Sequence, residues 1–511
     1  MKAIYLLILL FSSGFLNVQA ATDTLATKIL QPADMQADFR YLRRLLEETH
    51  PGLYRYTSKS VMQAKLDSID RSLDRPLPFY LFFRTIAGLI ADVRCAHTHA
   101  LPAKNWQKHF HNNWKMMPFY MFPSQQRAYV LLNGTNDQRI KPGFELLTIN
   151  GKPLEDIRQQ LYRYYWTDGY IESSRAATLK GELMNLFYYW FIDRPNEYVF
   201  TFRTMTGDTI QFATAGQPFS SMMKTITSNP INKQMIDWYV NKKQKHPWRL
   251  SFSDTLAQTA ILRIDGFGAN GISNGDQAIR RFQQFMDGAM TKLSKKQTQN
   301  LILDLRGNPG GWDSQGIELF TYLMKTDTAV AYYARQHAIT DSSEFVKFSD
   351  LSEADRKNIR NELIPEADGT FTLKQGSDTR EPKRYVPKPN RFRGQVYILM
   401  DAQSASTTSE FLAVAKANKV GTFIGVEAGG AYEGGNGSSF ITLDLPKSGI
   451  QVTTPLVYYD NAVPTPPQKG RGTLPDLTVP LTINDVLTHT DPQLNAVVNL
   501  IRQQNHQKLV R

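Results

Sequence analysis

A buried strand that runs into a glycine-rich turn is the part of this sequence best suited to holding a negative charge. It spans residues 301–311 and reads LILDLRGNPGG. Glycine lets backbone N–H groups face a cavity at the start of a helix, and such amides stabilise a developing anion. The turn lacks the Gly-Lys-Ser/Thr ending of a phosphate loop and the spacing of a dinucleotide site. These residues alone leave open an anion-holding turn or a plain tight turn.

A second strand-to-helix turn is rich in hydroxyl groups. Residues 396–411 read VYILMDAQSASTTSEF, an apolar strand followed by serines and threonines and then a helix. A serine at the start of a helix lies where backbone amides and the helix dipole stabilise an oxyanion, so it can serve as a nucleophile. Serine and threonine are also ordinary helix N-caps. Spacing alone favours the N-cap interpretation.

Together the two stretches resemble the S41 family of serine peptidases, the tail-specific or C-terminal processing proteases. That family couples a strand and turn of the form ILDLRGNPGG to a later helix that begins SASxxE. Weaker matches are residues 260–267 (AILRIDGF), 425–430 (GVEAGG), 445–450 (LPKSGI) and 470–479 (GRGTLPDLTV). The resemblance covers about residues 240–495. It implies an α/β fold with a layered βαβ core of the ClpP/crotonase kind, and a serine nucleophile.

The resemblance assigns the nucleophile to Ser406 when residues are counted from the strand end at Asp401. Counting backwards from Glu410 gives Thr407 instead, because this chain has one extra residue. We take Ser406 as the nucleophile and Ser409 as the reserve. The implied oxyanion donors are the backbone amides of Gly310, Gly311 and Thr407.

The general base is where this chain departs from the common family pattern. Many members use a lysine shortly after a later Gly-Glu turn to deprotonate the serine, but residues 429–435 of this chain read GGAYEGG. A serine hydroxyl is a weak nucleophile without an adjacent base. Residues 95–98, CAHT, resemble the G-H-T stretch of a lysine-free, tricorn-like branch, which makes His97 the base. The alternatives near it in sequence are His99, His109 and His111.

A carboxylate should orient His97, and the sequence offers three candidates, Glu433, Asp92 and Asp460, of which we place Glu433 first. Cys95 is the only thiol, and we expect it to be a buried packing residue. We expect Asp304 and Arg306 to pair structurally. No cluster has metal-ligand spacing, so neither a metal nor another cofactor is predicted.

Three regions must position these groups. Residues 21–104 form a predicted helical domain, with helices at 36–48, 60–73 and 78–93. Residues 105–215 form a β-rich domain that resembles a PDZ domain around Asn150-Gly151, a strong turn signal, although its helical segment 172–191 is long for that fold. Strands and helices alternate over residues 240–495, which predicts the peptidase domain. Residues 335–392 are polar and are expected to be an irregular insertion or lid.

Composition and the first residues define the setting. The chain has 511 residues, 41% hydrophobic, with a net charge of +12 and one cysteine. Its basic residues are scattered, so nucleic acid is not an expected partner. Residues 1–20 have a charged start, a short apolar core and a small-x-small end, which predicts a cleaved signal peptide and a secreted or periplasmic protein without an integral membrane segment.

The sequence therefore predicts a secreted serine-type endopeptidase that cleaves unstructured polypeptides. An oligomer is compatible with the sequence. Two alternatives stay open. A catalytically inactive peptide-binding protein on the same fold would explain the missing lysine, and an acyl hydrolase acting on small molecules would use the same groups.

Overall fold

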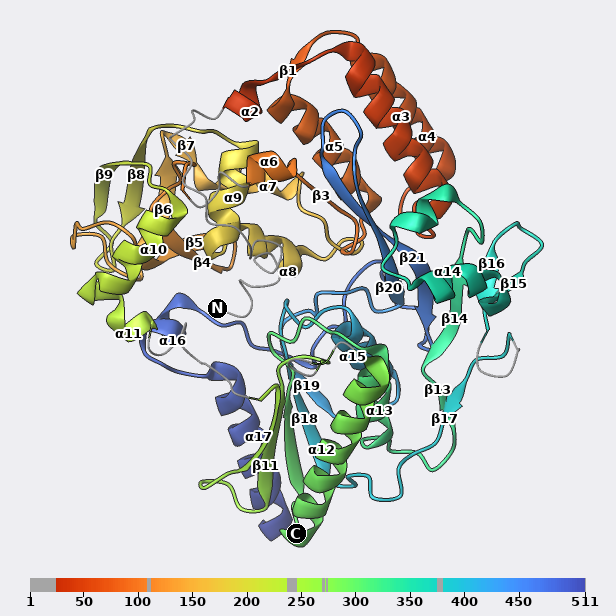
Figure 1. Ribbon diagram of the computed structural model, residues 1–511. Helices are drawn as coiled ribbons and strands as arrows, with labels where there is room; N and C mark the ends of the chain where they lie inside the picture. Colours follow the sequence, from red (N-terminus) through yellow and green to blue (C-terminus); the bar gives the residue numbers. More distant parts are fainter. Residues whose placement is uncertain are drawn as a thin grey trace.

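The computed structural model describes residues 24–107, 112–236, 246–268, 272, 274–374 and 380–510. The predicted signal peptide, residues 1–20, lies outside this set, as do the alternative bases His109 and His111. The described chain is mixed α/β, as the sequence predicted, with several sheets flanked by helices (Figure 1).

Three helices dominate the N-terminal part, close to the predicted ranges. They are α3 (Pro32–Thr49), α4 (Lys59–Ser72) and α5 (Phe79–Val93). Proline at the first position of α3 is favourable because its missing N–H would have no partner there. Helix α5 ends where Arg94 adopts a left-handed conformation with φ of 58°. This sharp stop turns the chain towards the segment that carries His97.

The middle part is an antiparallel sheet with helices beside it. Its strands are β4 (Phe119–Ser124), β5 (Arg127–Asn133), β6 (Glu145–Ile149), β7 (Lys152–Pro153), β8 (Glu197–Arg203) and β9 (Thr209–Ala215). Asn150 and Gly151 both have positive φ and make the tight turn between β6 and β7, as predicted. Its equivalence to a PDZ domain stays a prediction.

The predicted helical segment 172–191 is broken into three pieces. They are α8 (Glu172–Arg175), a 3₁₀ turn (Ala176–Leu179) and α9 (Gly181–Phe191), after the separate helix α7 (Leu154–Tyr162). Gly181 has a φ of 48°, and a Cβ there would lie 2.4 Å from the Tyr120 ring. The break is therefore imposed by the close packing of this glycine on the middle sheet.

A six-stranded sheet forms the base of the peptidase region. Its order is β10 (Trp248–Phe252), β11 (Thr259–Ile264), β12 (Asn300–Asp304), β18 (Gln395–Met400), β19 (Thr422–Gly425) and β22 (Leu477–Thr478). All neighbours pair in parallel except β10 with β11. Since β12 and β18 are adjacent and parallel, the glycine turn and the serine turn leave the sheet at the same edge.

Helices cover both faces of this sheet, which explains why its central strands are almost wholly apolar. Ile302 and Tyr397 pack with residues of α17 (Pro492–Val510). Leu303 and Ile398 face the main core, on the side of α13 (Asp313–Thr321) and α15 (Thr407–Ala417). Figure 1 shows α17 on one side of the strands and α12 (Gly275–Lys295) with α13 on the other.

A second sheet connects the peptidase region to the N-terminal part. Its long hairpin, β20 (Gly434–Asp444) and β21 (Gln451–Asn461), is drawn in blue beside the red N-terminal helices in Figure 1. The short strand β3 (His99–Leu101) pairs with β21. Further along the same edge of β21, opposite β20, lies β14 (Tyr333–Ala338), which is followed by β16 (Phe371–Leu373) and β15 (Leu363–Pro365).

The region 335–392 is less irregular than the sequence suggested. Besides β14, β15 and β16, it contains α14 (Glu353–Asn358) and the strand β17 (Arg384–Tyr385). Arg335, Gln336 and His337 pair with β21, so the extended sheet supplies the order that the polar composition of this region did not predict.

Candidate active site

Ser406 occupies a strained turn between β18 and α15. Its φ is 54° and its ψ is −133°, a conformation that residues with a side chain rarely adopt. Such strain persists where the surroundings enforce it and is common at active sites. The cause is visible here, because Gly310 leaves no room: a Cβ on it would lie 2.7 Å from the Ser406 Cβ. This sharp strand-to-helix turn is the geometry that exposes a nucleophilic serine.

The neighbouring hydroxyls have structural partners. The Thr407 hydroxyl lies 2.8 Å from the Gly311 carbonyl oxygen and 2.9 Å from Asp313 Oδ1. The Ser409 hydroxyl donates to the Ser406 carbonyl at 2.7 Å. Within the described ranges, no hydrogen bond occupies the Ser406 hydroxyl. Of the serine and threonine candidates, Ser406 is therefore the half-buried one left without an internal partner.

The glycine turn lies against the serine turn. Gly310 and Gly311 have φ of 99° and 138°, and the position of a Cβ on Gly310 is 2.9 Å from the Thr407 amide nitrogen. The Gly310 amide already donates to Asn308 Oδ1 at 2.9 Å. The Gly311 and Thr407 amides have no acceptor among the described residues. Of the three predicted oxyanion donors, these two are therefore available.

His97 follows α5 and precedes β3. His50 supports the turn, since the Gly52 amide donates to its Nδ1 at 3.0 Å and its Nε2 lies 2.8 Å from the Thr98 hydroxyl. Burial lowers the pKa of His50 to about 4, so this imidazole is neutral. The ring of His97 lies 5.5 Å from that of Phe440.

The charge of His97 acts on Asp313, a hydrogen-bond partner of the serine turn. Burial raises the pKa of Asp313, while its hydrogen bond from Thr407 and the charge of His97 lower it. Asp313 therefore interacts with both the imidazole and the residue that follows Ser406. The Nδ1 atom of His97 is buried and has no hydrogen-bond partner within the part of the chain that the structure describes.

The three candidate acids lie in different surroundings. Asp92 pairs with Lys65. Asp460 lies on β21 opposite Arg335. Glu433 Oε1 accepts from the Gly470 amide at 2.8 Å and lies 3.4 Å from Arg55, whereas its Oε2 is buried without a described partner. No hydrogen bond between His97 and any of the three occurs among the described residues, so the role of Glu433 stays a prediction.

Two residues near His97, the thiol Cys95 and the alternative base His99, have environments unsuited to catalysis. Cys95 is buried, and burial raises the pKa of its thiol to about 12, so the thiolate is scarce. Burial also lowers the pKa of His99 to about 4, and its ring packs 5.4 Å from that of Trp166. Both residues are accounted for by packing.

Asp304 and Arg306 form the expected structural pair. Arg306 Nη2 lies 2.8 Å from Asp304 and its Nη1 lies 2.8 Å from Asp491, and Arg263 Nη1 also bonds to Asp304 at 2.7 Å. Burial would raise the pKa of Asp304, but the hydrogen bonds and charges of the two arginines outweigh it and lower the pKa to about 2. This network holds the end of β12, just before the glycine turn.

Sequence reasoning missed three acids as site components, namely the buried Asp168 and Glu410 and the half-buried Asp313. Glu410 lies one turn after Ser406, and burial together with the charge of Asp313 raises its pKa to about 8. Tyr333 donates a hydrogen bond to its Oε2. Only Glu410 had a sequence signal, as the last residue of the family motif. The other two depend on contacts between distant segments.

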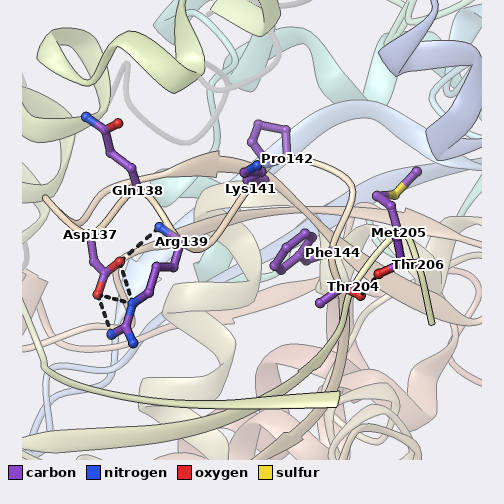
Figure 2. Close-up of a pocket in the computed structure, with 9 residues that line it drawn as sticks. All are labelled: Asp137, Gln138, Arg139, Lys141, Pro142, Phe144, Thr204, Met205 and Thr206. Carbon is purple, nitrogen blue, oxygen red and sulfur yellow. Dashed lines mark hydrogen bonds and ion pairs between the residues drawn. The ribbon is translucent and has the colours of Figure 1, made fainter. Parts of the chain in front are cut away.

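A cavity in the middle region is lined by residues outside the candidate site. It has a volume of about 760 Å³ and is lined by two loops, residues 137–144 and 204–206. Figure 2 shows the side chains that line it. Its most prominent charges, Asp137 and Arg139, pair with each other. Among the described residues, no group of three or more His, Cys, Asp or Glu could hold a metal ion. Nor does any helix among them have the length and apolarity to cross a membrane.

Comparisons with known proteins agree with this geometry. Residues 258–479 match the family model described as peptidase family S41. None of the curated proteins matches the sequence. The solved structure of mature CPAF in complex with lactacystin is 16% identical, with a TM-score of 0.58 over 92% of this chain and 99% of that one. A second structure of mature CPAF is 15% identical, with a TM-score of 0.55 over 89% and 94%.

At such low identity the structural likeness shows the fold. The match of residues 258–479 to peptidase family S41, on that fold, supports a serine-type peptidase.

Proposed function

We propose that the protein is a secreted endopeptidase that cleaves unstructured polypeptides with Ser406 as nucleophile and His97 as general base. The observation that carries the proposal is the strained Ser406, whose hydroxyl lies beside the Gly311 and Thr407 amides, all three without a partner among the described residues. The Ser406 oxygen attacks the peptide carbonyl carbon and its proton passes to His97. The carbonyl oxygen becomes an oxyanion that accepts hydrogen bonds from Gly311 and Thr407.

The second half of the cycle uses the same groups. When the tetrahedral intermediate collapses, the C–N bond breaks and His97 returns the proton to the departing amine. Water then attacks the acyl-enzyme with His97 again as the base. Glu433 is our candidate for stabilising the imidazolium, because its Oε2 is buried and lacks a partner among the described residues.

A fluorophosphonate probe tests the nucleophile. The wild-type protein should be labelled on Ser406, Ser406→Ala should lose labelling, and His97→Ala should slow labelling by about 100-fold or more, the usual contribution of a general base. Ser438→Ala is a matched control, since Ser438 is also a serine with positive φ but is exposed on β20. Labelling that persists in Ser406→Ala would move the role to another hydroxyl.

Casein, an unstructured polypeptide, tests the reaction. Internal cleavage by the wild type that Ser406→Ala abolishes supports an endopeptidase. A labelled enzyme that cleaves esters but no peptide is an acyl hydrolase, and a folded protein that is never labelled is the inactive peptide-binding alternative. For secretion, the protein recovered outside the cytoplasm should have the intact mass of a chain that starts at residue 21.

A further inference from the structure

A short loop of the middle region, residues 167–171, lies between the His97 segment and the peptidase region. The Gly169 amide donates to the Arg94 carbonyl at 3.0 Å, and the Arg94 guanidinium donates back to the Gly169 carbonyl at 3.2 Å. On the other side, the Tyr170 amide donates to the Gly470 carbonyl at 2.7 Å. The loop is therefore tied both to the end of α5 and to the C-terminal part of the chain.

Asp168 lies at the centre of this junction and is only 6% exposed. Its Oδ1 accepts from the amide of Ala96, the residue directly before His97, at 2.8 Å. Its Oδ2 lies 3.6 Å from the positions that Cβ atoms on Gly430 and Gly435 would occupy. The same position on Gly430 is 2.1 Å from the Ser409 hydroxyl. One carboxylate thus reaches from the His97 backbone to the turn that packs on the nucleophile helix.

Burying a carboxylate costs free energy unless a hydrogen bond or an opposite charge offsets the lost hydration, and Asp168 has both. The charge of Asp168 acts on the buried guanidinium of Arg55, together with that of Glu433. A hydrogen bond from an amide to a charged carboxylate is also stronger than one to a neutral acceptor. The Asp168–Ala96 contact is therefore a firm constraint on the backbone at residue 96 rather than a surface contact.

We propose that Asp168 is a positioning residue that fixes the backbone before His97 and so sets the reach of the imidazole towards Ser406. This inference rests on the proposed function of the Ser406–His97 pair. Catalytic groups must be held to within a fraction of an ångström, and a misplacement of about 1 Å can slow a reaction by about 100-fold. A site assembled from three distant segments needs such a fixed point, and Asp168 supplies it from the middle segment.

The test compares Asp168→Ala with Asp168→Asn, because asparagine keeps an oxygen that accepts the Ala96 hydrogen bond. Asp168→Ala should slow fluorophosphonate labelling by about 10- to 100-fold, while Asp168→Asn should stay close to the wild type. Hydrogen exchange of peptides covering residues 94–98 should speed up in the alanine variant and not in the asparagine variant. Thermal unfolding of each variant shows whether it is folded.

Asp208→Ala is the control, since Asp208 lies in the exposed turn between β8 and β9 and accepts from the Thr206 hydroxyl. The proposal is overturned if Asp168→Ala is labelled at the wild-type rate, or if both variants are slowed equally. If the alanine variant does not fold, slow labelling or faster exchange in Asp168→Asn still contradicts it. If the Ser406→Ala variant is still labelled, the proposed function is refuted. The hydrogen-exchange measurement then tests only the contact between Asp168 and the Ala96 amide.

Discussion

At the scale of single residues, the candidate site depends on places where a side chain is absent. Gly310 touches Ser406 so closely that a methyl group would lie 2.7 Å from its Cβ. Gly430 lies against the Ser409 hydroxyl in the same way, at 2.1 Å. These contacts hold the serine turn in a conformation that its own backbone preference opposes. The conformation of Ser406 is thus a property of its glycine neighbours as much as of its own backbone.

Gly310→Ala should therefore abolish most of the activity. The added Cβ pushes on Ser406 and on the Thr407 amide, and loss of one oxyanion donor alone costs roughly 100- to 1000-fold in rate. Gly207→Ala is a matched control, because Gly207 has a similar φ of 95° but open space around its Cβ position. It should lose about 1–2 kcal/mol of stability through backbone strain and keep its fluorophosphonate labelling rate. Equal labelling of both variants would contradict the steric argument.

At the scale of elements, helix α15 is anchored by a buried acid that stays protonated. Burial and the charge of Asp313 raise the pKa of Glu410 to about 8, although hydrogen bonds from Tyr333 and Tyr459 lower it. Tyr333 belongs to β14 and Tyr459 to β21. The neutral carboxyl therefore connects the nucleophile helix to two strands of the second sheet.

This anchor should make stability depend on pH. In the unfolded chain Glu410 ionises near its ordinary value of 4.5, but in the folded protein only near 8. Between these values the unfolded state binds fewer protons, so the free energy of unfolding falls as pH rises and levels off above about 8. Urea unfolding of Glu410→Gln should show a smaller fall than the wild type over that range.

Burial also raises the pKa of Glu182 to about 8, so Glu182→Gln should act in the same direction as Glu410→Gln and add to it. Glu353→Gln, on the exposed helix α14, is the surface control. Identical curves for Glu410→Gln and the wild type would contradict the buried acid.

At the scale of the whole molecule, distant parts of the chain share one core and one site. Buried residues from Phe83 of α5 through Phe200 of β8 to Tyr459 of β21 belong to a single hydrophobic cluster. Strand β3, which follows His97, is completed by pairing with β21. The N-terminal and peptidase regions are therefore parts of one core, the first carrying His97 and the second Ser406.

Asp38 should be one of the residues that stabilise the contact between the N-terminal and peptidase regions. This carboxylate on α3 is fully buried and accepts from the Lys447 and Ser448 amides, at 2.8 and 2.7 Å, in the turn between β20 and β21. Asp38→Ala removes two hydrogen bonds to a carboxylate, and each such bond to a charged group is worth about 1.5–3 kcal/mol. Asp34→Ala on the same helix removes only an exposed ion pair with Lys447 and should cost less than about 1 kcal/mol. Chemical denaturation that ranks the two variants equally would refute the tie.

The sequence by itself determined the local elements and the identity of the two turns. Apolar strands before residues 304 and 401, glycines after the first and hydroxyls after the second are local patterns, and the structure has a strand and turn at each. Periodicity likewise predicted α3, α4 and α5. The sequence pattern did not predict the break within residues 172–191 or the strands within residues 335–392. In both segments, contact with a sheet determines the backbone conformation.

Only the tertiary structure decided which of the adjacent hydroxyls is free and which acids lie near them. Thr407 and Ser406 are neighbours in sequence, but only the Thr407 hydroxyl has hydrogen-bond partners among the described residues. They are the Gly311 carbonyl of the glycine turn and the Asp313 carboxylate at the start of α13. Asp168 lies 72 residues from Ala96 along the chain, and no local pattern marks it. Packing brings such residues together through contacts summed over the whole chain, whereas motifs record only what lies within a few residues.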